Sequence, residues 1–352
     1  MNLKYILKKI LYGLLVVFSV TVLLSSIIFL APIDPARLTF GQRTDQKTLE
    51  FKRNQLGLNQ PLYVQLCSYL NDISPISVHT STDLDKLPYS KFVLFQAAKI
   101  SVVLKFPYLR NSFQTGESVT TMIASAFPKT LILSLFAIFI AIILGVSLGV
   151  ISAVHQNTVI DFFINTLSVI GYSLPTYVAA MLLALFFGYY FSHVTNLNLQ
   201  GSIFEYDDFG NEIIVWKNLI LPTIALGLRP VAIISQLTRS IVIENLSQNY
   251  IKTAKAKGLR SSIVLFRHAL RNAINPLITS ISGWMASLLA GAFFVESVFN
   301  FKGIGDLTVN ALLNFDLPVV LGAIIFTSLI FVIINILSDL LNTYLDPRLE
   351  LV

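Results

Sequence analysis

One stretch of the sequence decides the class of fold: Thr130-Leu-Ile-Leu-Ser-Leu-Phe-Ala-Ile-Phe-Ile-Ala-Ile-Ile-Leu-Gly-Val-Ser-Leu-Gly-Val150, which continues to Ile160 without an Asp, Glu, Lys or Arg. A helix of about 20 apolar residues crosses the hydrocarbon core of a bilayer. This run is longer than that, so it predicts a membrane-spanning helix. The composition agrees, because 55% of the residues are hydrophobic, only 12% are charged and the mean hydropathy is +0.72, far from the usage of soluble domains.

Further uncharged runs lie on both sides of this stretch: Ile10–Ile33, Phe162–Gln200, Asn218–Leu228, Asn272–Val295 and Leu317–Ser338. The run Asn218–Leu228 is short, but it resumes after Arg229 as Val231–Thr238, so we count it as one span. The sequence therefore predicts an all-α polytopic membrane protein with six transmembrane helices.

The short loops predict the orientation. Lys4, Lys8 and Lys9 precede the first span, and the basic segment after the fourth span lies on the same side if the spans alternate. The positive-inside rule makes that side cytoplasmic, so we expect both termini to be cytoplasmic. The first span is longer than the roughly 7–15 residues of a signal-peptide core, so we expect it to be retained. The net charge of +6 then reflects topology, and no nucleic-acid partner is predicted.

The basic segment between Leu246 and Ala273 predicts a docking site. It carries six basic residues and no acidic one: Lys252, Lys255, Lys257, Arg260, Arg267 and Arg271. Ser247 is a candidate N-cap, Gly258 a candidate residue just after a helix end, and Ser261 or Ser262 a candidate cap of a second helix. The pattern predicts a helix, a tight turn and a second helix. An amphipathic helix lying on anionic membrane lipid is the alternative interpretation.

Motifs for catalysis and metal binding are absent from the sequence. It contains no G-x-x-x-x-G-K-[ST] loop, no G-x-S-x-G turn and no H-E-x-x-H helix. The single cysteine, Cys67, and the four scattered histidines have no metal-ligand spacing. We therefore expect no catalytic residue, no metal and no cofactor bound by this chain.

Several motifs together resemble one family. The loop Tyr250-Ile-Lys-Thr-Ala-Lys-Ala-Lys-Gly-Leu259, followed by Arg267-His-Ala-Leu-Arg-Asn-Ala-Ile-Asn-Pro276, resembles the cytoplasmic EAA loop of binding-protein-dependent ABC importer permeases. The branch it is most similar to transports dipeptides, oligopeptides or nickel. The likeness extends through most of the chain in these motifs: Leu56-Gly-Leu-Asn-Gln-Pro-Leu-Tyr-Val-Gln65, Gly171-Tyr-Ser-Leu-Pro175, Leu221-Pro222, Glu296-Ser-Val-Phe299, Gly303-Ile-Gly305 and Leu345-Asp-Pro-Arg-Leu349.

The resemblance implies an architecture and a set of partners. It implies the type I ABC importer permease fold in a bacterial inner membrane, with a second homologous permease in a heterodimer, two ABC ATPase subunits that use ATP, and an extracytoplasmic solute-binding protein. The implied domains are 1–33 (anchor and first span), 34–127 (a small extracytoplasmic segment), 128–345 (the permease core, with a coupling loop at 245–272) and 346–352 (a cytoplasmic tail). Because the 34–127 segment is neither low-complexity nor strongly charged, we expect it to be a folded cap.

The resemblance also implies site residues. The ATPase-coupling positions are Tyr250, Ile251, Thr253, Ala254, Gly258, Leu259, Arg267 and His268. The motif itself is altered here, since Lys252-Thr-Ala254 stands where the general EAA pattern lies and His268-Ala-Leu-Arg271 where its I-x-L-P end lies. We expect Tyr250 and Ile251 to fill an apolar groove on the ATPase, with the lysines and Arg260 on the polar rim.

Candidate residues for a translocation path lie in three spans: Arg229, Tyr172, Ser173, Gly283 and Ser287. Each has a second interpretation. Arg229 either faces the path, pairs with an acidic group, or is a buried arginine held by carbonyl groups. Tyr172 and Ser173 precede Pro175 at either a pore kink or a tolerated proline, and Gly283 and Ser287 either line the path or pack against a neighbouring helix.

The function predicted from all these residues is a permease subunit that moves peptides, either dipeptides or oligopeptides, by ATPase-driven alternating access. Within the same class the alternative cargo is nickel or another small solute. From other classes, the alternatives are a membrane scaffold that recruits an ATPase without transport, and a membrane-embedded hydrolase, which the missing catalytic motifs disfavour.

Overall fold

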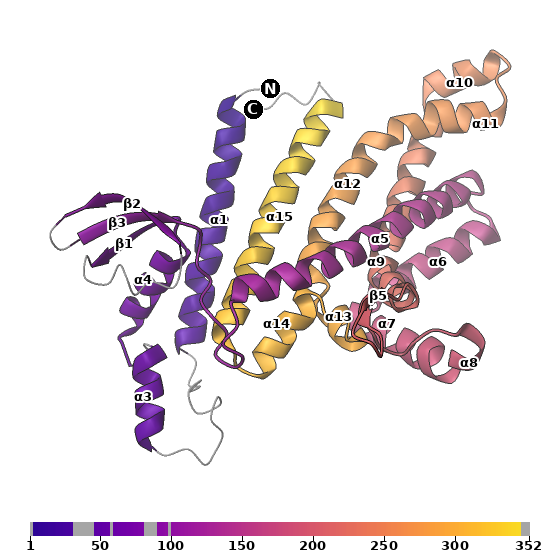
Figure 1. The fold of residues 1–352 in the computed structure, drawn as a ribbon. Coiled ribbons are helices and arrows are strands. Elements are labelled where there is room, and N and C mark those ends of the chain that lie inside the picture. Colours follow the sequence, from indigo (N-terminus) through magenta and orange to yellow (C-terminus); the bar gives the residue numbers. More distant parts are fainter. Residues whose placement is uncertain (1–2, 31–45, 57–58, 81–89, 98–99, 346–352) are drawn as a thin grey trace. The chain divides into compact units, whose positions relative to one another are not determined.

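The computed structural model describes residues 3–30, 46–56, 59–80, 90–97 and 100–345, and helices predominate in them (Figure 1). The helices are α1 (Leu3–Leu30), α3 (Gln46–Leu56), α4 (Leu62–Ile73), α5 (Val119–Val154), α6 (Val159–Ser173), α7 (Thr176–Leu183), α8 (Ser192–Thr195), α9 (Lys217–Ser247), α10 (Asn249–Ala256), α11 (Ser261–Ile263), α12 (Leu270–Gly291), α13 (Phe293–Phe299), α14 (Ile304–Leu313) and α15 (Leu317–Leu345). Two π-helical segments, η2 (Ala184–Tyr190) and η3 (Val264–Ala269), interrupt them. The strands are β1 (Ile76–Thr80), β2 (Lys91–Gln96), β3 (Ile100–Lys105), β4 (Phe204–Tyr206) and β5 (Glu212–Ile214). The predicted cytoplasmic tail, 346–352, lies outside the described residues.

The apolar runs form the predicted kind of helix. Four helices of the described chain are long and apolar enough to cross a bilayer alone, namely α1, α5, α9 and α15. Two bent pairs, α6 with α7 and η2, and α12 with α13, bring the total up to six if each pair counts as one span. The prediction of a mostly helical polytopic membrane protein is confirmed. A kink at Pro175 was one of two interpretations of the sequence, whereas the bend between α12 and α13 was not predicted.

The break between α6 and α7 has a local cause. The two helices are bent by 104°, and Leu174 at the break is extended, with φ −71° and ψ 127°. Leu174 precedes Pro175, and the proline ring disfavours the helical conformation of the residue before it. Pro175 then begins the next helix from an extended conformation of its own, with ψ 134°. The Ser-Leu-Pro sequence therefore ends one helix and starts another within a single apolar run.

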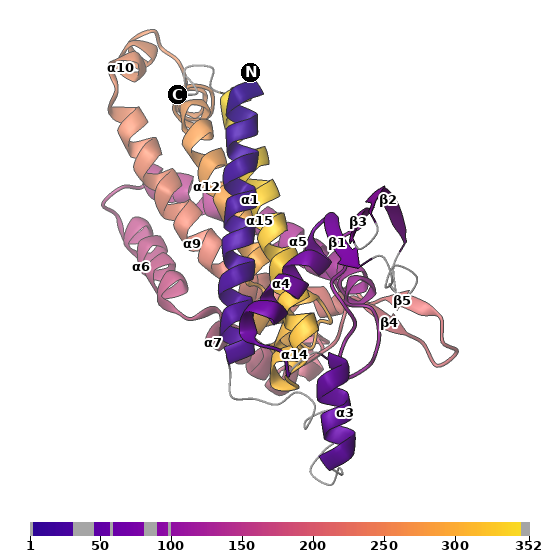
Figure 2. The same cartoon turned by 90° about the vertical axis from the view of Figure 1, so that its left-hand side faces the viewer.

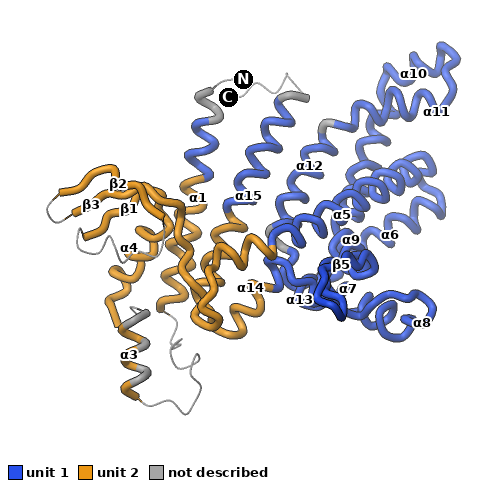
Figure 3. Tube along the Cα trace, in the orientation of Figure 1, with its two compact units in different colours: residues 1–13, 127–306, 329–352 blue, residues 14–126, 307–328 orange. Residues whose placement is uncertain are grey.

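The chain folds into two compact units, which are shown in different colours in Figure 3. One consists of residues 1–13, 127–306 and 329–352, and the other of residues 14–126 and 307–328. We call them the loop unit and the cap unit, and describe each by itself.

Helix α9 is the centre of the loop unit. Leu221 and Leu226 of α9 belong to the main apolar cluster together with Leu133 of α5, Ala180 of α7 and Val295 of α13. Figures 1 and 2 both show α6 running beside α9, and both place α10 beyond the end of α9. The loop between α9 and α12 therefore stands at one end of this helix layer.

Small residues let α5 approach α9 closely. A Cβ added to Gly149 would lie 2.5 Å from the carbonyl oxygen of Ser235, and one added to Gly145 would lie 2.8 Å from the side chain of Ile234. Neither distance is sterically possible, so both glycines are required at this contact. Within a bilayer, helices associate through such close packing because lipid tails are as apolar as the side chains. The Gly145-x-x-x-Gly149 sequence thus has a packing role.

The cap unit packs α4 against two spans. Tyr69 of α4 is 1% exposed and lies in an apolar cluster with Leu321 and Ile325 of α15 and with Leu24 and Phe29 of α1. The T-shaped contact of the Phe29 and Tyr69 rings, with centroids 6.4 Å apart, belongs to the same cluster. Part of the segment between the first two spans is therefore anchored on the spans themselves.

A small antiparallel sheet in the order β1-β3-β2 follows α4. The all-α class did not include it, because the apolar runs 92–98 and 100–106 are too short for periodicity to distinguish strand from helix. Side chains alternate between the two faces of a strand. Ser101 and Val103 are fully buried on one face of β3. Ile100, Leu104 and the facing Phe92 are exposed on the other, which we call the apolar sheet face.

Candidate functional site

The predicted basic loop is a helical hairpin that joins two spans. Helix α10 follows α9 after one extended residue, Gln248, with ψ 153°. The return arm consists of α11 and η3 and continues without interruption into α12. The loop is therefore continuous with α12, because no non-helical residue separates η3 from α12.

Gly258 makes the turn of this hairpin. Its φ is +77°, a left-handed conformation that costs any residue with a Cβ. The Leu259 N–H donates to the Ala254 carbonyl (3.4 Å) and the Gly258 N–H donates to the Lys255 carbonyl (2.9 Å). These two bonds form a Schellman motif with Gly258 in the residue position just after the helix end, as predicted. A Cβ at Gly258 would meet nothing within 4 Å, so only the backbone conformation requires glycine there.

The predicted N-caps are wrong. Helix α10 is preceded by Gln248 and α11 by Arg260, and neither makes a side-chain cap. Helix α9 extends about two and a half turns beyond the apolar run that ends at Thr238, so Ser247 is its last residue and its hydroxyl donates to the Glu244 carbonyl at 2.7 Å. Ser261 is the first residue inside α11.

The loop has a core of its own. Ile251 and Ala269 are 0% exposed and Val264 is 1% exposed, and they pack together with Ala254 and the half-buried Leu246. The expectation that Ile251 projects into a groove on an ATPase is therefore wrong for this conformation. Its side chain is used to hold α10 against η3, and an apolar residue at this position is required by the loop itself.

The outer surface of the loop is exposed and basic. Tyr250 is 40% exposed, and its hydroxyl accepts a hydrogen bond from the Asn272 side-chain amide at 2.9 Å. This bond connects the first turn of α10 to α12 and limits the orientation of the ring. Leu259, Thr253 and Arg267 are also exposed, whereas His268 is half-buried. Lys252, Lys255, Lys257 and Arg260 are exposed on the same segment of the loop.

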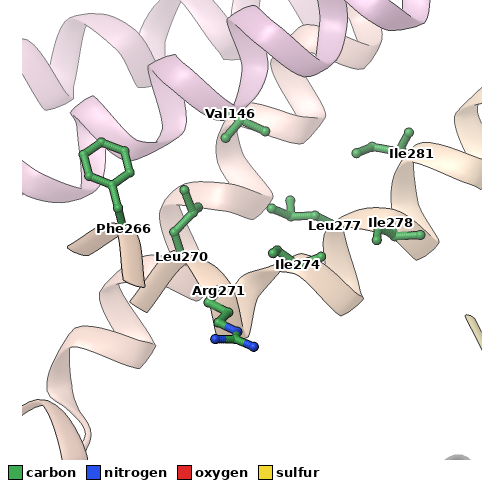
Figure 4. Close-up of a pocket in the computed structure, with 8 residues that line it drawn as sticks. All are labelled: Val146, Phe266, Leu270, Arg271, Ile274, Leu277, Ile278 and Ile281. Atoms are coloured by element: carbon green, nitrogen blue, oxygen red, sulfur yellow. The ribbon is translucent and has the colours of Figure 1, made fainter. Parts of the chain in front are cut away.

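A groove lies where the loop enters α12. It has a volume of about 460 Å³, and its residues are Val146 of α5, Phe266 of η3, and Leu270, Arg271, Ile274, Leu277, Ile278 and Ile281 of α12. Figure 4 shows the apolar side chains along α12 facing Val146, with Arg271 as the single charged residue of the groove. The groove is thus a largely apolar hollow lined by α5, η3 and α12.

Sequence reasoning missed a buried ion pair below the loop. Asp161 at the start of α6 is 4% exposed and accepts two hydrogen bonds of 2.7 Å from Arg239 of α9. It also accepts from the Ser152 hydroxyl (2.5 Å), the Asn157 N–H (2.9 Å) and the Asn165 amide (2.7 Å). A bidentate arginine–carboxylate pair is among the strongest polar contacts in proteins. It ties the α5–α6 turn to α9. The signal in the sequence was a lone acid between two apolar runs, which gave no indication of its partner 78 residues away.

A second buried carboxylate explains two of the sequence motifs. Glu296 is fully buried, and its Oε2 accepts hydrogen bonds from the N–H groups of Gly305 (2.7 Å) and Asp306 (3.2 Å). A carboxylate at the N-terminus of α14 satisfies otherwise unpaired N–H groups there. A Cβ at Gly305 would lie 2.5 Å from the Cα of Phe293. Glu296 and the Gly303-Ile-Gly305 sequence therefore form one capped helix junction.

Two of the candidate path residues are brought together. The Arg229 guanidinium carbon lies 5.0 Å from the centroid of the Tyr172 ring, and Tyr172, Ser173 and Arg229 are all exposed. Arg229 is therefore not the buried arginine of the alternative interpretation. Gly283 and Ser287 are exposed one turn apart on α12, and no hydrogen bond or ring contact of the described residues joins them to Arg229. The part of the chain that the structure describes also contains no group of three His, Cys, Asp or Glu side chains placed to hold a metal.

The architecture and the loop are those of a membrane permease that works with separate partners. Residues 145–351 match the binding-protein-dependent transport system inner membrane component family, and residues 2–134 match the N-terminal family of the same transport systems. The chain belongs to the family of binding-protein-dependent transport system inner membrane components.

Several relatives in the same family have names that describe a transported substrate. The chain is 31% identical to the dipeptide transport system permease protein DppB of Alkalihalophilus pseudofirmus, and the match covers 99% of each chain. It is 37% identical to the dipeptide transport system permease protein DppB of Bacillus subtilis, over 71% of this chain and 76% of that one. It is 31% identical to the glutathione transport system permease protein GsiC of Escherichia coli O6:H1, over 99% of each.

Proposed function

We propose that this chain is one of two permease subunits of an ABC importer that carries peptides across the inner membrane. The single observation that supports it most is the loop between α9 and α12, a self-supporting basic hairpin continuous with a span. The relatives named as dipeptide and glutathione permeases support a peptide as cargo.

The loop residues divide into two groups in this proposal. Tyr250, Thr253, Leu259 and Arg267 contact the ATPase, because they are exposed on the loop surface. A second group keeps the hairpin rigid: Ile251 and Ala254 by packing, Gly258 by its backbone conformation, and the half-buried His268 by its place on the return arm. ATPase closure then moves α10, and the continuous helix from α11 to α12 passes the movement into the membrane.

The remaining parts of the assembly are proposed on the same basis. Two ABC ATPase subunits supply ATP hydrolysis, so this chain binds no cofactor itself and is no enzyme. A second, homologous permease forms a heterodimer with it, and a solute-binding protein delivers the peptide to its outer side. Both termini are cytoplasmic, and the domain limits are 1–33, 34–127, 128–345 and 346–352.

Uptake by the reconstituted assembly tests the proposal. The chain is co-expressed with its candidate partner permease, ATPases and solute-binding protein, and uptake of a labelled dipeptide, a labelled tripeptide and nickel is measured with ATP. We expect ATP-dependent peptide uptake, with Tyr250→Ala reducing both uptake and ATPase binding. Uptake of nickel alone would reassign the cargo, and ATPase binding without any uptake would leave a scaffold role.

A further inference from the structure

A stripe of polar side chains runs along the C-terminal part of α9. Its exposed members are Arg229, Gln236, Ser240 and Glu244. Spacings of seven, four and four residues return to one face of a helix with 3.6 residues per turn. Thr238, on the opposite face, is fully buried. We call these four residues the polar stripe. Because polar groups in a span are costly in lipid, such a stripe faces protein or a water-filled cavity.

Arg229 lies deep within the span. At 1.5 Å per residue it is about 18 Å along the helix axis from Lys217 and about 27 Å from Ser247, the two ends of α9. Its side chain is exposed, and no carboxylate of the described residues pairs with it. The Arg229 guanidinium therefore has no carboxylate partner among the described residues, and it offers five N–H donors in a planar arrangement suited to a carboxylate.

The neighbourhood of Arg229 has the geometry of a binding position. The Arg229 guanidinium lies over the Tyr172 ring, with its central carbon 5.0 Å from the ring centroid, which is within the range of a cation–π contact. Tyr172 is two residues before the break at Leu174. A break in a spanning helix is tolerated where it is buried in protein or lines a water-filled cavity, and discontinuous helices often form substrate sites in transporters.

We infer that the polar stripe lines the route of the substrate and that Arg229 binds the terminal carboxylate of a passing peptide. The inference rests on the proposed function and adds to it a substrate feature, a free carboxylate, that the permease itself recognises. A lipid phosphate is the other anion with suitable chemistry, but it would require the whole stripe to face lipid. Tyr172 is a positioning residue, because its ring contacts the Arg229 guanidinium.

The test compares a tripeptide with its C-terminal amide in the reconstituted assembly. We expect Arg229→Gln to lower uptake of the acid relative to the amide roughly tenfold, the size of one lost charge-assisted hydrogen bond. Arg229→Lys should retain part of the preference. The preference of the solute-binding protein is the same in every assembly, so it cancels when the ratios are compared. Arg271→Gln, which removes a charge from the groove on α12, should leave the ratio as in wild type.

A second measurement does not depend on the binding protein. Gln236→Cys in a Cys67→Ser background is treated with anionic and cationic methanethiosulfonates, with and without the tripeptide. We expect faster reaction with the anionic reagent, loss of that advantage in Arg229→Gln, and protection by the peptide acid.

The outcomes separate the inference from the proposed function. Uptake of both peptides with the same ratio in wild type and Arg229→Gln overturns only the carboxylate role of Arg229. No reaction of Gln236→Cys with either reagent overturns the water-filled route. No uptake of either peptide by wild type overturns the proposed function, and this inference with it.

Discussion

Substitution of Gly258 measures how much the conformation of one residue contributes to energy coupling. Its φ of +77° costs an L-residue with a Cβ about 1–2 kcal/mol. Asparagine tolerates this conformation better, and a β-branched residue tolerates it worst. A Cβ would meet nothing within 4 Å, so no clash adds to the cost. One or two kcal/mol changes an equilibrium by a factor of about 5–30, so we expect coupling to decrease in the order Gly, Asn, Ala, Val.

The assay is the ratio of peptide uptake to ATP hydrolysis in proteoliposomes, together with hydrogen exchange at the Leu259 amide. Gly258→Ala should lower the ratio and speed exchange, and Gly258→Val should do both more strongly. Gly210 is the matched control, because it has a φ of +80° and equally open surroundings in the β4–β5 hairpin. Gly210→Ala should keep the wild-type ratio. Full coupling in Gly258→Val, or an equal loss in Gly210→Ala, would refute the reasoning.

Three further outcomes are expected. Ile251→Ala should cost about 2–5 kcal/mol of loop stability, since the side chain is fully buried, and should increase protease cleavage of the loop. Ile251→Val should cost only about 0.5–1.5 kcal/mol. Equal cleavage of both variants would contradict the loop core. Asp161→Asn leaves the Arg239 charge without its partner and should destabilise the subunit by about 3 kcal/mol. The melting temperature in detergent should fall, and an unchanged melting temperature would argue against the ion pair. The exposed Cys67 should react with an impermeant maleimide in intact cells, and Ser261→Cys in a Cys67→Ser background should not; the reverse result would invert the proposed orientation.

The spans could be predicted because each is a long uncharged run, and the length of such a run is what a bilayer demands. The strands of the cap unit could not be predicted, because they are only five or six residues long, and runs of that length are ambiguous between strand and helix. The break at Leu174 was visible as Ser-Leu-Pro, but its angle depends on the packing of α6 and α7 against α9, which local sequence does not specify.

Some residues of the candidate site could be predicted from the sequence and others could not, because only some depend on local conformation. Gly258 was recognisable because a left-handed helix end is a local property of the chain. The inward direction of the Ile251 side chain was not recognisable, because the face of α10 that turns inward is set by Val264 and Ala269 on the return arm. The Asp161–Arg239 pair was missed for the same reason, because its partners come from different helices.

The apolar sheet face has a practical consequence for biochemistry on this protein. It exposes Phe92, Ile100 and Leu104 on a small sheet whose outer strand β2 has no further strand beside it among the described residues. Exposed apolar strands with open edges promote self-association once a chain leaves its normal surroundings. Purification of the subunit alone is thus expected to yield oligomers joined through this sheet. A charge at Phe92, such as Phe92→Lys, is expected to suppress them on a sizing column.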